Sequence, residues 1–300
     1  MKHSHRPKQH SHVADELFEY RSVEKKKLKL TMAVTGIMMV AEIVGGFWTN
    51  SLALISDAGH MFTHFFALAI SFAAIICASK KSCHHRTFGF YRVEILAALL
   101  NSLFLFVATF WILAEGIKRI THPAPILGVQ MFVIAVIGLL VNLASVFILH
   151  GTHKDDLNVK SAFLHMVGDT LSSVVIVIGA IVIYFTGWNI IDPILSIGIA
   201  GVILVWGWNL FKDSVNILLE AAPKGMNTDE ISKVLVTEIP SIEEIADMHV
   251  WEITTKMYSM TAHVKLKPEI GRQVEKQILT RIKQIVDEKF DIEHTTIELG

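Results

Sequence analysis

The chain has 300 residues, of which 52% are hydrophobic and 18% are charged. A soluble domain would carry more charge, about 25%, and the mean hydropathy is +0.48, so the composition argues against a wholly soluble protein. The formal net charge of −1 gives no overall basic field of the kind that binds nucleic acid, and we expect no nucleic-acid partner. Cys77 and Cys83 are too few for a disulfide framework and are expected to be free thiols.

The first 29 residues are polar and end in a basic run. They contain no short apolar segment followed by a small-residue cleavage site, so we expect no cleavable signal peptide. The tail and the second loop also contain short His-rich tracts, which are typical of flexible segments that bind metal weakly. The alternative is that these histidines only take up and release protons. The histidines of the tail and of the second loop are His3, His5, His10, His12, His84 and His85.

Six apolar runs then follow, each long enough to approach or cross about 30 Å of hydrocarbon. They lie near residues 30–48, 52–78, 93–117, 126–149, 161–186 and 190–211. Six spans place both chain ends on the same side of the membrane. Lys and Arg are concentrated in the tail and in the second and fourth loops, whereas the opposite side has only Lys118 and Arg119. Because positive charge marks the cytoplasmic side, we predict that both termini are cytoplasmic.

Two pairs of ionisable residues lie one helical turn apart inside these predicted spans: His60 with His64, and His165 with Asp169. Residues i and i+4 project from one face of a helix, so two facing helices would present three imidazoles and one carboxylate to one ion. Each such group costs roughly 2.5–3.5 kcal/mol near the middle of a membrane helix, which indicates a function. The alternatives are hydrogen bonds between neighbouring helices, or core helices of a soluble protein.

The ligand types suggest both a metal and a coupling mechanism. Four nitrogen and oxygen ligands suit tetrahedral Zn²⁺, with Co²⁺, Cd²⁺ and Ni²⁺ as alternatives. Zinc binds deprotonated imidazole and carboxylate, so metal loading releases protons and acidification releases metal. Asp57, three residues before His60 on nearly the same helix face, is a candidate to orient an imidazole as a second-shell acceptor. A helix–helix hydrogen bond is the alternative for Asp57.

Beyond about Lys212 the charge rises and the apolar runs shorten, which predicts a soluble domain over residues 212–300. Asn227 with Glu230 is typical of a helix start, and Pro240 would stop that helix. Residues 245–254 and 259–267 are predicted to form a hairpin, a second helix follows, and a short strand ends the domain, so the order is α-β-β-α-β. The second strand should turn Met260, Ala262, Val264 and Leu266 inward, and Val274, Ile278, Ile282 and Ile285 mark the second helix.

Four segments carry a family resemblance. They are SLALISDAGHMFTHFFAL at 51–68, FGFYRVEILAALLN at 88–101, SAFLHMVGDTLSSV at 161–174 and DMHVWEI at 247–253. On these the chain resembles the cation diffusion facilitator family, in its bacterial zinc, cobalt and cadmium efflux branch. The resemblance implies a homodimer in the inner membrane of a bacterium, with six spans per protomer and a cytosolic domain similar to a metallochaperone. It also implies exchange of cytosolic divalent metal for external protons, a role in metal resistance, and no organic cofactor.

The family's transport site maps onto His60, His64, His165 and Asp169, with one departure. Where the zinc-handling branch usually has aspartate, this chain has His64. A divalent ion held by three imidazoles and one carboxylate leaves a formal net charge of about +1, whereas two carboxylates would make the site neutral. We therefore expect a weaker electrostatic hold on the ion and sharper competition by protons.

The resemblance also assigns roles outside the predicted spans. It places a basic residue near Arg92 against an acidic residue near Glu220, where the pair would lock the hinge of the dimer. It suggests a regulatory metal site in the cytosolic domain, for which His249, His263 and Glu298 are the candidate ligands. The alternative is that these are surface residues with no tight metal site.

The expected fold class is therefore an α-helical membrane protein with six transmembrane helices plus a small cytosolic α+β domain. We predict a tail over 1–29, a transport domain over 30–211 and a cytosolic domain over 212–300. We interpret the chain as a secondary active transporter that exports divalent metal, zinc first, in exchange for protons. It lacks the His-Glu-x-x-His helix of a metallohydrolase and is not expected to be an enzyme. A metal-gated channel and a membrane metal sensor stay open as alternatives.

Overall fold

The structure is a computed structural model that describes residues 33–78, 89, 91–149, 157–268 and 271–300. Within these ranges, the side chains of residues 64, 67–68, 70–78, 145–149 and 157–168 lie outside the description. Two compact units are present. One combines the residues up to 76 with Leu100–Trp208, and the other combines residues 77–99 with Asn209–Gly300.

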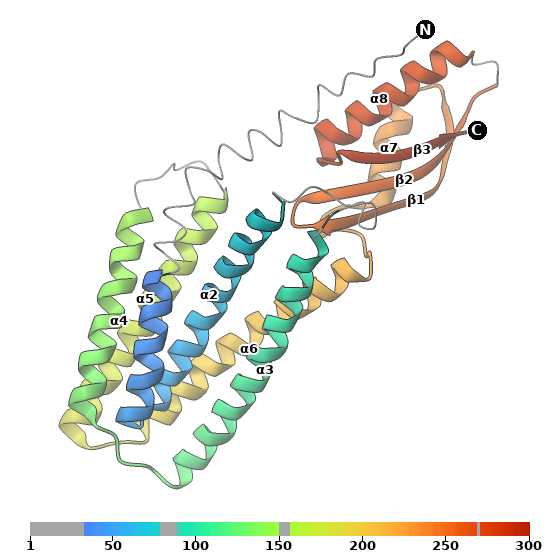
Figure 1. Ribbon diagram of the computed structural model, residues 1–300. Coiled ribbons are helices and arrows are strands. Elements are labelled where there is room, and N and C mark those ends of the chain that lie inside the picture. The colour runs from blue at the N-terminus through green and yellow to red at the C-terminus, as the bar shows by residue number, and fades with distance from the viewer. Residues whose placement is uncertain (1–32, 79–88, 90, 150–156, 269–270) are drawn as a thin grey trace. The chain divides into compact units, whose positions relative to one another are not determined.

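Six helices occupy the six predicted spans (Figure 1). They are Ala33–Thr49, α2 (Leu52–Ala78), α3 (Tyr91–Thr121), α4 (Gly128–Leu149), α5 (Leu157–Thr186) and α6 (Ile191–Leu218). Among the described residues, α3, α6 and the Asp169–Thr186 part of α5 are long and apolar enough to cross a membrane. With 31 and 28 residues, α3 and α6 are about 46 Å and about 42 Å long, so each exceeds the hydrocarbon thickness.

The helices bury polar side chains and expose large apolar ones. Glu42, Asp57 and Asn101 are no more than 3% exposed, whereas Phe47 is 66% and Phe185 is 78% exposed. A soluble helical bundle would show the reverse arrangement. Hydrocarbon is the solvent in which exposed aromatic and aliphatic side chains are favourable and in which polar groups must find partners inside the protein. The burial pattern therefore supports the membrane assignment independently of composition.

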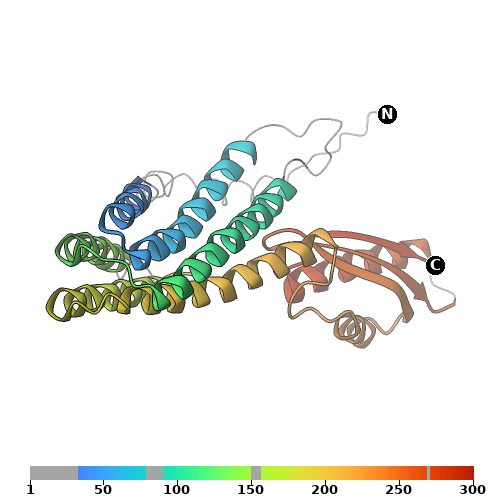
Figure 2. The same cartoon turned by 90° about the horizontal axis from the view of Figure 1, so that it is seen from below.

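The start of α2 is packed on two sides. Ala53 and Leu54 belong to a buried cluster that includes residues of α4 and α5, and those two helices lie side by side (Figure 2). Leu52 instead contacts a second cluster, with Ile112 of α3 and Ala200 of α6. The helix that carries His60 is thus fixed at its first turn between two groups of helices.

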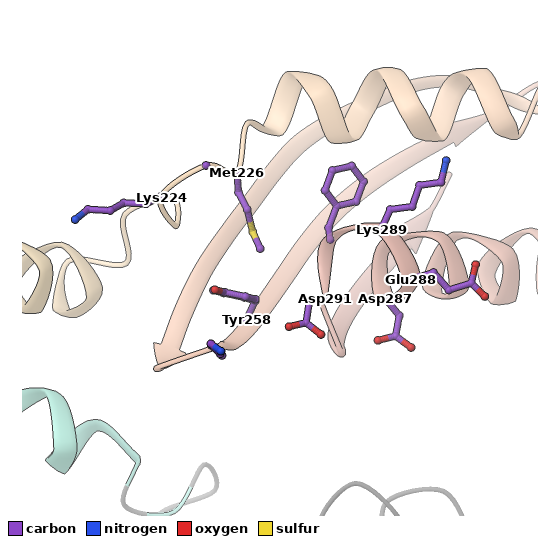
Figure 3. A pocket seen from close by; sticks show the side chains of 10 residues that line it. Lys224, Met226, Tyr258, Asp287, Glu288, Lys289 and Asp291 are labelled. Atoms are coloured by element: carbon purple, nitrogen blue, oxygen red, sulfur yellow. The ribbon is translucent and has the colours of Figure 1, made fainter. Parts of the chain in front are cut away.

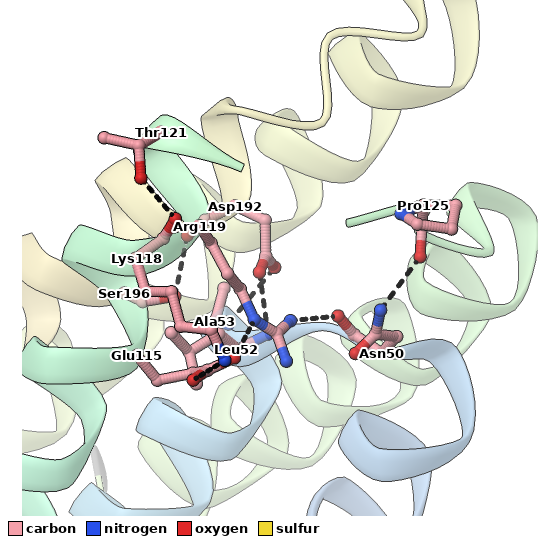
Figure 4. Close-up of polar contacts among 10 residues, drawn as sticks. All are labelled: Asn50, Leu52, Ala53, Glu115, Lys118, Arg119, Thr121, Pro125, Asp192 and Ser196. Atoms are coloured by element: carbon pink, nitrogen blue, oxygen red, sulfur yellow. Dashed lines mark hydrogen bonds and ion pairs between the residues drawn. The ribbon is translucent and has the colours of Figure 1, made fainter. Parts of the chain in front are cut away.

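Asp192 joins the start of α6 to the start of α2 (Figure 4). Its carboxylate is fully buried and accepts hydrogen bonds from the Ser51 hydroxyl at 2.5 Å and from the Leu52 and Ala53 backbone N–H groups at 2.7 and 3.1 Å. A helix N-terminus presents unpaired N–H groups and the positive end of the helix dipole. The Asp192 carboxylate accepts hydrogen bonds from the unpaired N–H groups and places a negative charge at the positive end of the dipole. It therefore caps α2, although it belongs to α6.

Arg119 of α3 strengthens the same corner from a third helix. Its guanidinium donates to the Asn50 carbonyl oxygen at 2.7 Å and to Glu115 at 2.9 Å. Asn50 has a φ of 57°, in the left-handed region that asparagine tolerates better than most residues, and its side chain donates to the Pro125 carbonyl oxygen. The turn that precedes α2 is therefore held by side chains and not only by its own backbone.

The C-terminal unit has the predicted α-β-β-α-β order. It contains α7 (Thr228–Glu238), β1 (Ile242–Thr254), β2 (Met257–Leu266), α8 (Arg272–Phe290) and β3 (His294–Leu299). Strand β1 pairs antiparallel with β2, which pairs in parallel with β3. The side chain of Asn227 caps α7 by accepting from the Asp229 N–H, as predicted, and the helix ends before Pro240.

Both helices cover one face of this sheet. Met260, Ala262 and Val264 of β2 are at most 2% exposed and pack in one cluster with apolar residues of α7 and α8, while His263 points to the other, exposed face. The alternation predicted for β2 is confirmed. The second predicted helix is present as α8, which buries Ile278, Ile282 and Ile285; Val274, in the first turn of α8, is 45% exposed.

Replacing Asp192 with alanine should destabilise the protein by on the order of 2 kcal/mol, because three buried donors lose their acceptor. Asp192→Asn keeps one acceptor oxygen and should lose less. The measurement is the apparent melting temperature of the purified protein in detergent. Asp229→Ala, at the exposed first turn of α7, is the matched control, and an equal loss in both variants would contradict the capping role.

Candidate functional site

His60 and Asp169 meet between α2 and α5. The Nε2 atom of His60 lies 2.8 Å from Oδ1 of Asp169, and the His60 side chain is 8% exposed. On another side the imidazole packs against the indole of Trp206 in α6, with ring centroids 5.0 Å apart. The predicted meeting of the second and fifth spans is therefore present for one residue of each helical pair.

Two serines of α5, Ser172 and Ser173, form hydrogen bonds beside this contact. The Ser172 hydroxyl donates to the carboxylate of Asp57 at 3.2 Å and to the backbone oxygen of Asp169 at 2.8 Å. Ser173 donates to the same backbone oxygen at 3.1 Å and accepts from Asn142 of α4 at 2.9 Å. The sequence interpretation did not include these serines, although their spacing of three and four residues from Asp169 places them on its side of the helix.

Asp57 lies in α2 and is 3% exposed. Its hydrogen bond with Ser172 links α2 to α5 at a second point, beside the His60–Asp169 contact. A buried carboxylate needs such donors, because an ionised group without partners is costly in an apolar interior. The assignment of Asp57 as a residue that orients an imidazole stays a prediction.

His64 and His165 lie in the described helices α2 and α5, but their side chains are outside the described part. Each is four residues from a member of the His60–Asp169 contact, and that spacing puts it on the same helix face. Among the side chains that the structure describes, no three from His, Cys, Asp and Glu are arranged to hold one ion. Two of the four predicted ligands are thus placed, and they are within hydrogen-bonding distance of each other.

The chemistry of this contact favours exchange between a proton and a metal ion. The lone pairs that Nε2 of His60 and Oδ1 of Asp169 would offer to a metal are the ones that now share a hydrogen bond. Metal ligands of these types must be deprotonated to bind. These two atoms are therefore of the types for which a metal and a proton can compete.

The cytosolic candidates His249, His263 and Glu298 are connected through a residue that the sequence interpretation missed. Asp247 lies 3.0 Å from Nε2 of His249 and 3.8 Å from Nδ1 of His263, and Nε2 of His263 lies 3.3 Å from Glu298. Asp247 sits at a bulge in β1 with a φ of 50°, so its side chain departs from the strand alternation that the sequence pattern assumes. All four side chains are more than half exposed.

Arg92 and Glu220 form the ion pair that the resemblance suggested, with Nη2 and Oε1 2.6 Å apart. Both side chains are exposed, at 42% and 56%, so solvent screens the pair and its contribution to stability is about 0–1 kcal/mol. Nearby in the same unit, Glu94 accepts a hydrogen bond from the hydroxyl of Thr254 at 2.9 Å. These two contacts join the start of α3 to the cytosolic part of the chain.

A cavity of about 490 Å³ lies beside the β1–β2 turn and the end of α8 (Figure 3). Its lining combines lysines with acidic residues, and Lys289 pairs with Glu238 of α7. Burial raises the pKa of Tyr258 in this lining, and the negative charges of Glu252 and Asp291 raise it further. Because charges of both signs line the cavity, it favours no single class of ligand.

Comparisons with known proteins agree with this architecture over nearly the whole chain. Residues 28–219 match the family described as the cation efflux transmembrane domain, and residues 223–299 match the cation efflux protein, cytoplasmic domain. The chain is 42% identical to the metal cation efflux system protein CzcD of Cupriavidus metallidurans, over 91% of this chain and 86% of that protein.

Two further relatives are similar over comparable lengths. The zinc transporter ZitB of Escherichia coli is 39% identical, over 97% of this chain and 91% of that protein. The cadmium, cobalt and zinc/H(+)-K(+) antiporter of Bacillus subtilis is 36% identical, over 92% of this chain and 88% of that protein.

Proposed function

Because the chain belongs to the cation diffusion facilitator family of cation efflux proteins, we propose that His60, His64, His165 and Asp169 bind the exported ion. The chain is an integral protein of the bacterial inner membrane and exports divalent metal cations; it is a transporter and not an enzyme. The 2.8 Å contact between His60 and Asp169 is the observation that supports the proposed site, because it joins one residue of each predicted helical pair inside the membrane unit.

Zinc is the proposed principal substrate, with cobalt and cadmium as further substrates. Three imidazoles and a carboxylate suit tetrahedral zinc. The relatives whose names specify zinc, or cadmium, cobalt and zinc, support this choice. The ion is cargo, so the chain needs no resident cofactor for this function.

Protons are the proposed counter-ion. When the site faces the cytoplasm, zinc displaces protons from imidazole and carboxylate; when it faces a more acidic exterior, protons displace zinc. Nε2 of His60 and Oδ1 of Asp169, which share a hydrogen bond, are atoms of the types that protons and zinc both bind. Free imidazole titrates at about pH 6.5, within the range of the two compartments, which makes histidine a suitable switch.

The two ends of the chain are proposed to be cytoplasmic, with a tail over 1–29, a transport domain over 30–211 and a cytosolic domain over 212–300. The distribution of Lys and Arg supports this orientation. The two matched families, which divide near residue 220, support the division. The matched cytoplasmic domain also supports a homodimer.

Two regulatory features in the cytosolic unit are proposed as well. His249, His263 and Glu298, together with Asp247, would bind metal with low affinity: their exposed side chains contact one another only in series, and they would have to rearrange before three of them could hold one ion. The Arg92–Glu220 ion pair would hold the start of α3 against the segment that follows α6, and so keep the hinge of the dimer closed.

The first test is zinc uptake into proteoliposomes that enclose a zinc dye and have an acidic interior. The wild type should accumulate zinc, and His165→Ala should abolish accumulation because a ligand is lost. His64→Asp should retain uptake and lower the zinc concentration needed for half-maximal rate, since a second carboxylate makes the loaded site neutral.

The control is His122→Ala. It replaces an exposed histidine that directly follows α3 and is not among the proposed ligands, so uptake should be unchanged. Uptake that follows only the zinc gradient and ignores pH would favour the channel. Zinc binding without any uptake would favour the sensor.

The cytosolic site is tested in the full chain that carries His165→Ala, where the transport site is disabled. Adding His263→Ala should weaken the remaining zinc binding by roughly tenfold or more, because His263 contacts both Asp247 and Glu298. Adding His294→Ala, a histidine at the start of β3, is the control and should change nothing. Equal zinc binding in the two double variants would refute this site.

Reversal of the charge at Arg92 should slow transport with little change in melting temperature, because the pair is exposed and contributes little to stability. Combining Arg92→Glu with Glu220→Arg should restore most of the rate. Reversal at Lys265, which pairs with Glu243 elsewhere on the surface of the same unit, should leave transport unchanged. A double reversal that fails to rescue the single one would argue against the interlock.

A further inference from the structure

Glu42 is a buried carboxylate that the four proposed ligands do not include. It lies in the middle of the helix Ala33–Thr49 and is 1% exposed. Its Oε2 atom has no hydrogen-bond partner among the residues that the structure describes. Insertion of a carboxyl group near the middle of a membrane helix is costly, so a residue of this kind indicates a function.

A glycine of α4 provides the space for this side chain. A Cβ atom built on Gly138 would lie only 2.6 Å from Oε1 of Glu42 and 3.1 Å from the end of Met38. Any larger residue at 138 would have to displace the carboxyl group. The carboxyl group is therefore seated against the backbone of α4, in a fitted position inside the bundle and not in a water-exposed groove.

Asp57 is the titratable group of α2 that interacts electrostatically with Glu42, and both carboxyl groups are buried. From α4 the neighbour is Gly138, which carries no charge, and Met38 of the same helix is apolar. Asp57 in turn shares Ser172 with Asp169, the proposed ligand of α5. Glu42 is thus linked to the proposed metal site electrostatically through Asp57, which is joined to α5 by the hydroxyl of Ser172.

Two neighbouring buried carboxylates cannot both be ionised at low cost, because like charges repel and burial disfavours the charged form of each. Asp57 has a hydroxyl donor in Ser172, which favours its ionised form, whereas Oε2 of Glu42 has no protein donor among the described residues. The charge of the pair is therefore best placed on Asp57, and the proton on Glu42.

We propose that Glu42 is a proton-binding site of the transporter that is additional to the metal ligands. When a divalent cation enters the site, its positive charge stabilises a second carboxylate nearby. The O–H bond of Glu42 then breaks, the electron pair stays on the carboxylate, and the proton passes to water on the cytoplasmic side. When metal leaves on the other side, a proton from external water restores the carboxyl group. This inference rests on the proposed metal site.

The test counts protons released when zinc binds to the purified full chain in lipid nanodiscs, using a pH-indicator dye in weak buffer. Protons released by the His165→Ala variant are subtracted from those released by the protein with His165 intact. This subtraction removes the contribution of zinc bound by the tail or by the cytosolic unit. Glu42→Gln, which keeps the size of the side chain but cannot ionise, should release about one proton fewer per zinc ion than the wild type.

The sign of the pH dependence follows from the same scheme. At acidic pH the wild-type Glu42 is protonated and resembles glutamine, so both proteins should bind zinc alike. At alkaline pH the wild type gains an ionised carboxylate near the metal, so the variant should bind more weakly. The plot of log Kd against pH should therefore be shallower in Glu42→Gln, with a slope lower by about one.

Glu115→Gln is the matched control, because Glu115 is a carboxylate of the same membrane unit that pairs with Arg119 and does not face the site. It should release as many protons as the wild type. An infrared difference spectrum of the wild type gives a measurement that needs no variant: zinc should remove the carbonyl band of a protonated carboxyl group.

Equal proton counts in the wild type and in Glu42→Gln, or a zinc-insensitive infrared spectrum, would overturn the role of Glu42 while leaving the metal site intact. Absence of any zinc binding that depends on His165 would instead overturn the proposed function, and this inference with it. The two failures are thus separated by the His165→Ala comparison.

Discussion

The burial of ionisable groups between helices is the constraint on which the membrane unit depends. His60, Asp57 and Glu42 are each at most 6% exposed, in helices whose outer surfaces are apolar. Hydrocarbon offers such groups no partner, so each must be satisfied by another helix, by a proton or by a cation. The contacts between α2 and α5 are the result, and they are consistent with the proposed site, where protons and metal ions would replace each other.

The first turn of α2 is fixed differently from its middle. At the first turn, Asp192 accepts three hydrogen bonds, and apolar clusters pack on both sides. Around His60, one imidazole–carboxylate contact and a hydroxyl-mediated link carry the contact with α5. Contacts that depend on protonation can change with pH, whereas a buried cap with three donors changes only at a large cost. The end of α2 that Asp192 caps is therefore the part of this helix least sensitive to pH.

Periodicity and turn chemistry in the sequence predicted the six helices, the α-β-β-α-β order and the inward face of β2, because each of these depends on local pattern. The roles of Asp192 and Asp247 were not predictable in this way. Asp192 caps a helix that begins 140 residues earlier in the chain, and Asp247 reaches His263 only because a bulge interrupts the regular register of β1. Long-range capping and bulges depend on tertiary packing, which local patterns do not encode.

The replacement of the usual aspartate by His64 changes how the charge of the ion is balanced. With one carboxylate among the four proposed ligands, a bound divalent ion leaves an uncompensated positive charge in a medium that screens it poorly. Asp57 is next to the site and Glu42 is next to Asp57, so ionisation of both would restore a negative balance around the ion. A site with fewer anionic ligands can then still hold metal at neutral pH, and it loses that hold when the surrounding carboxylates take up protons. The carboxylates outside the ligand set would in this way set the pH at which the metal leaves.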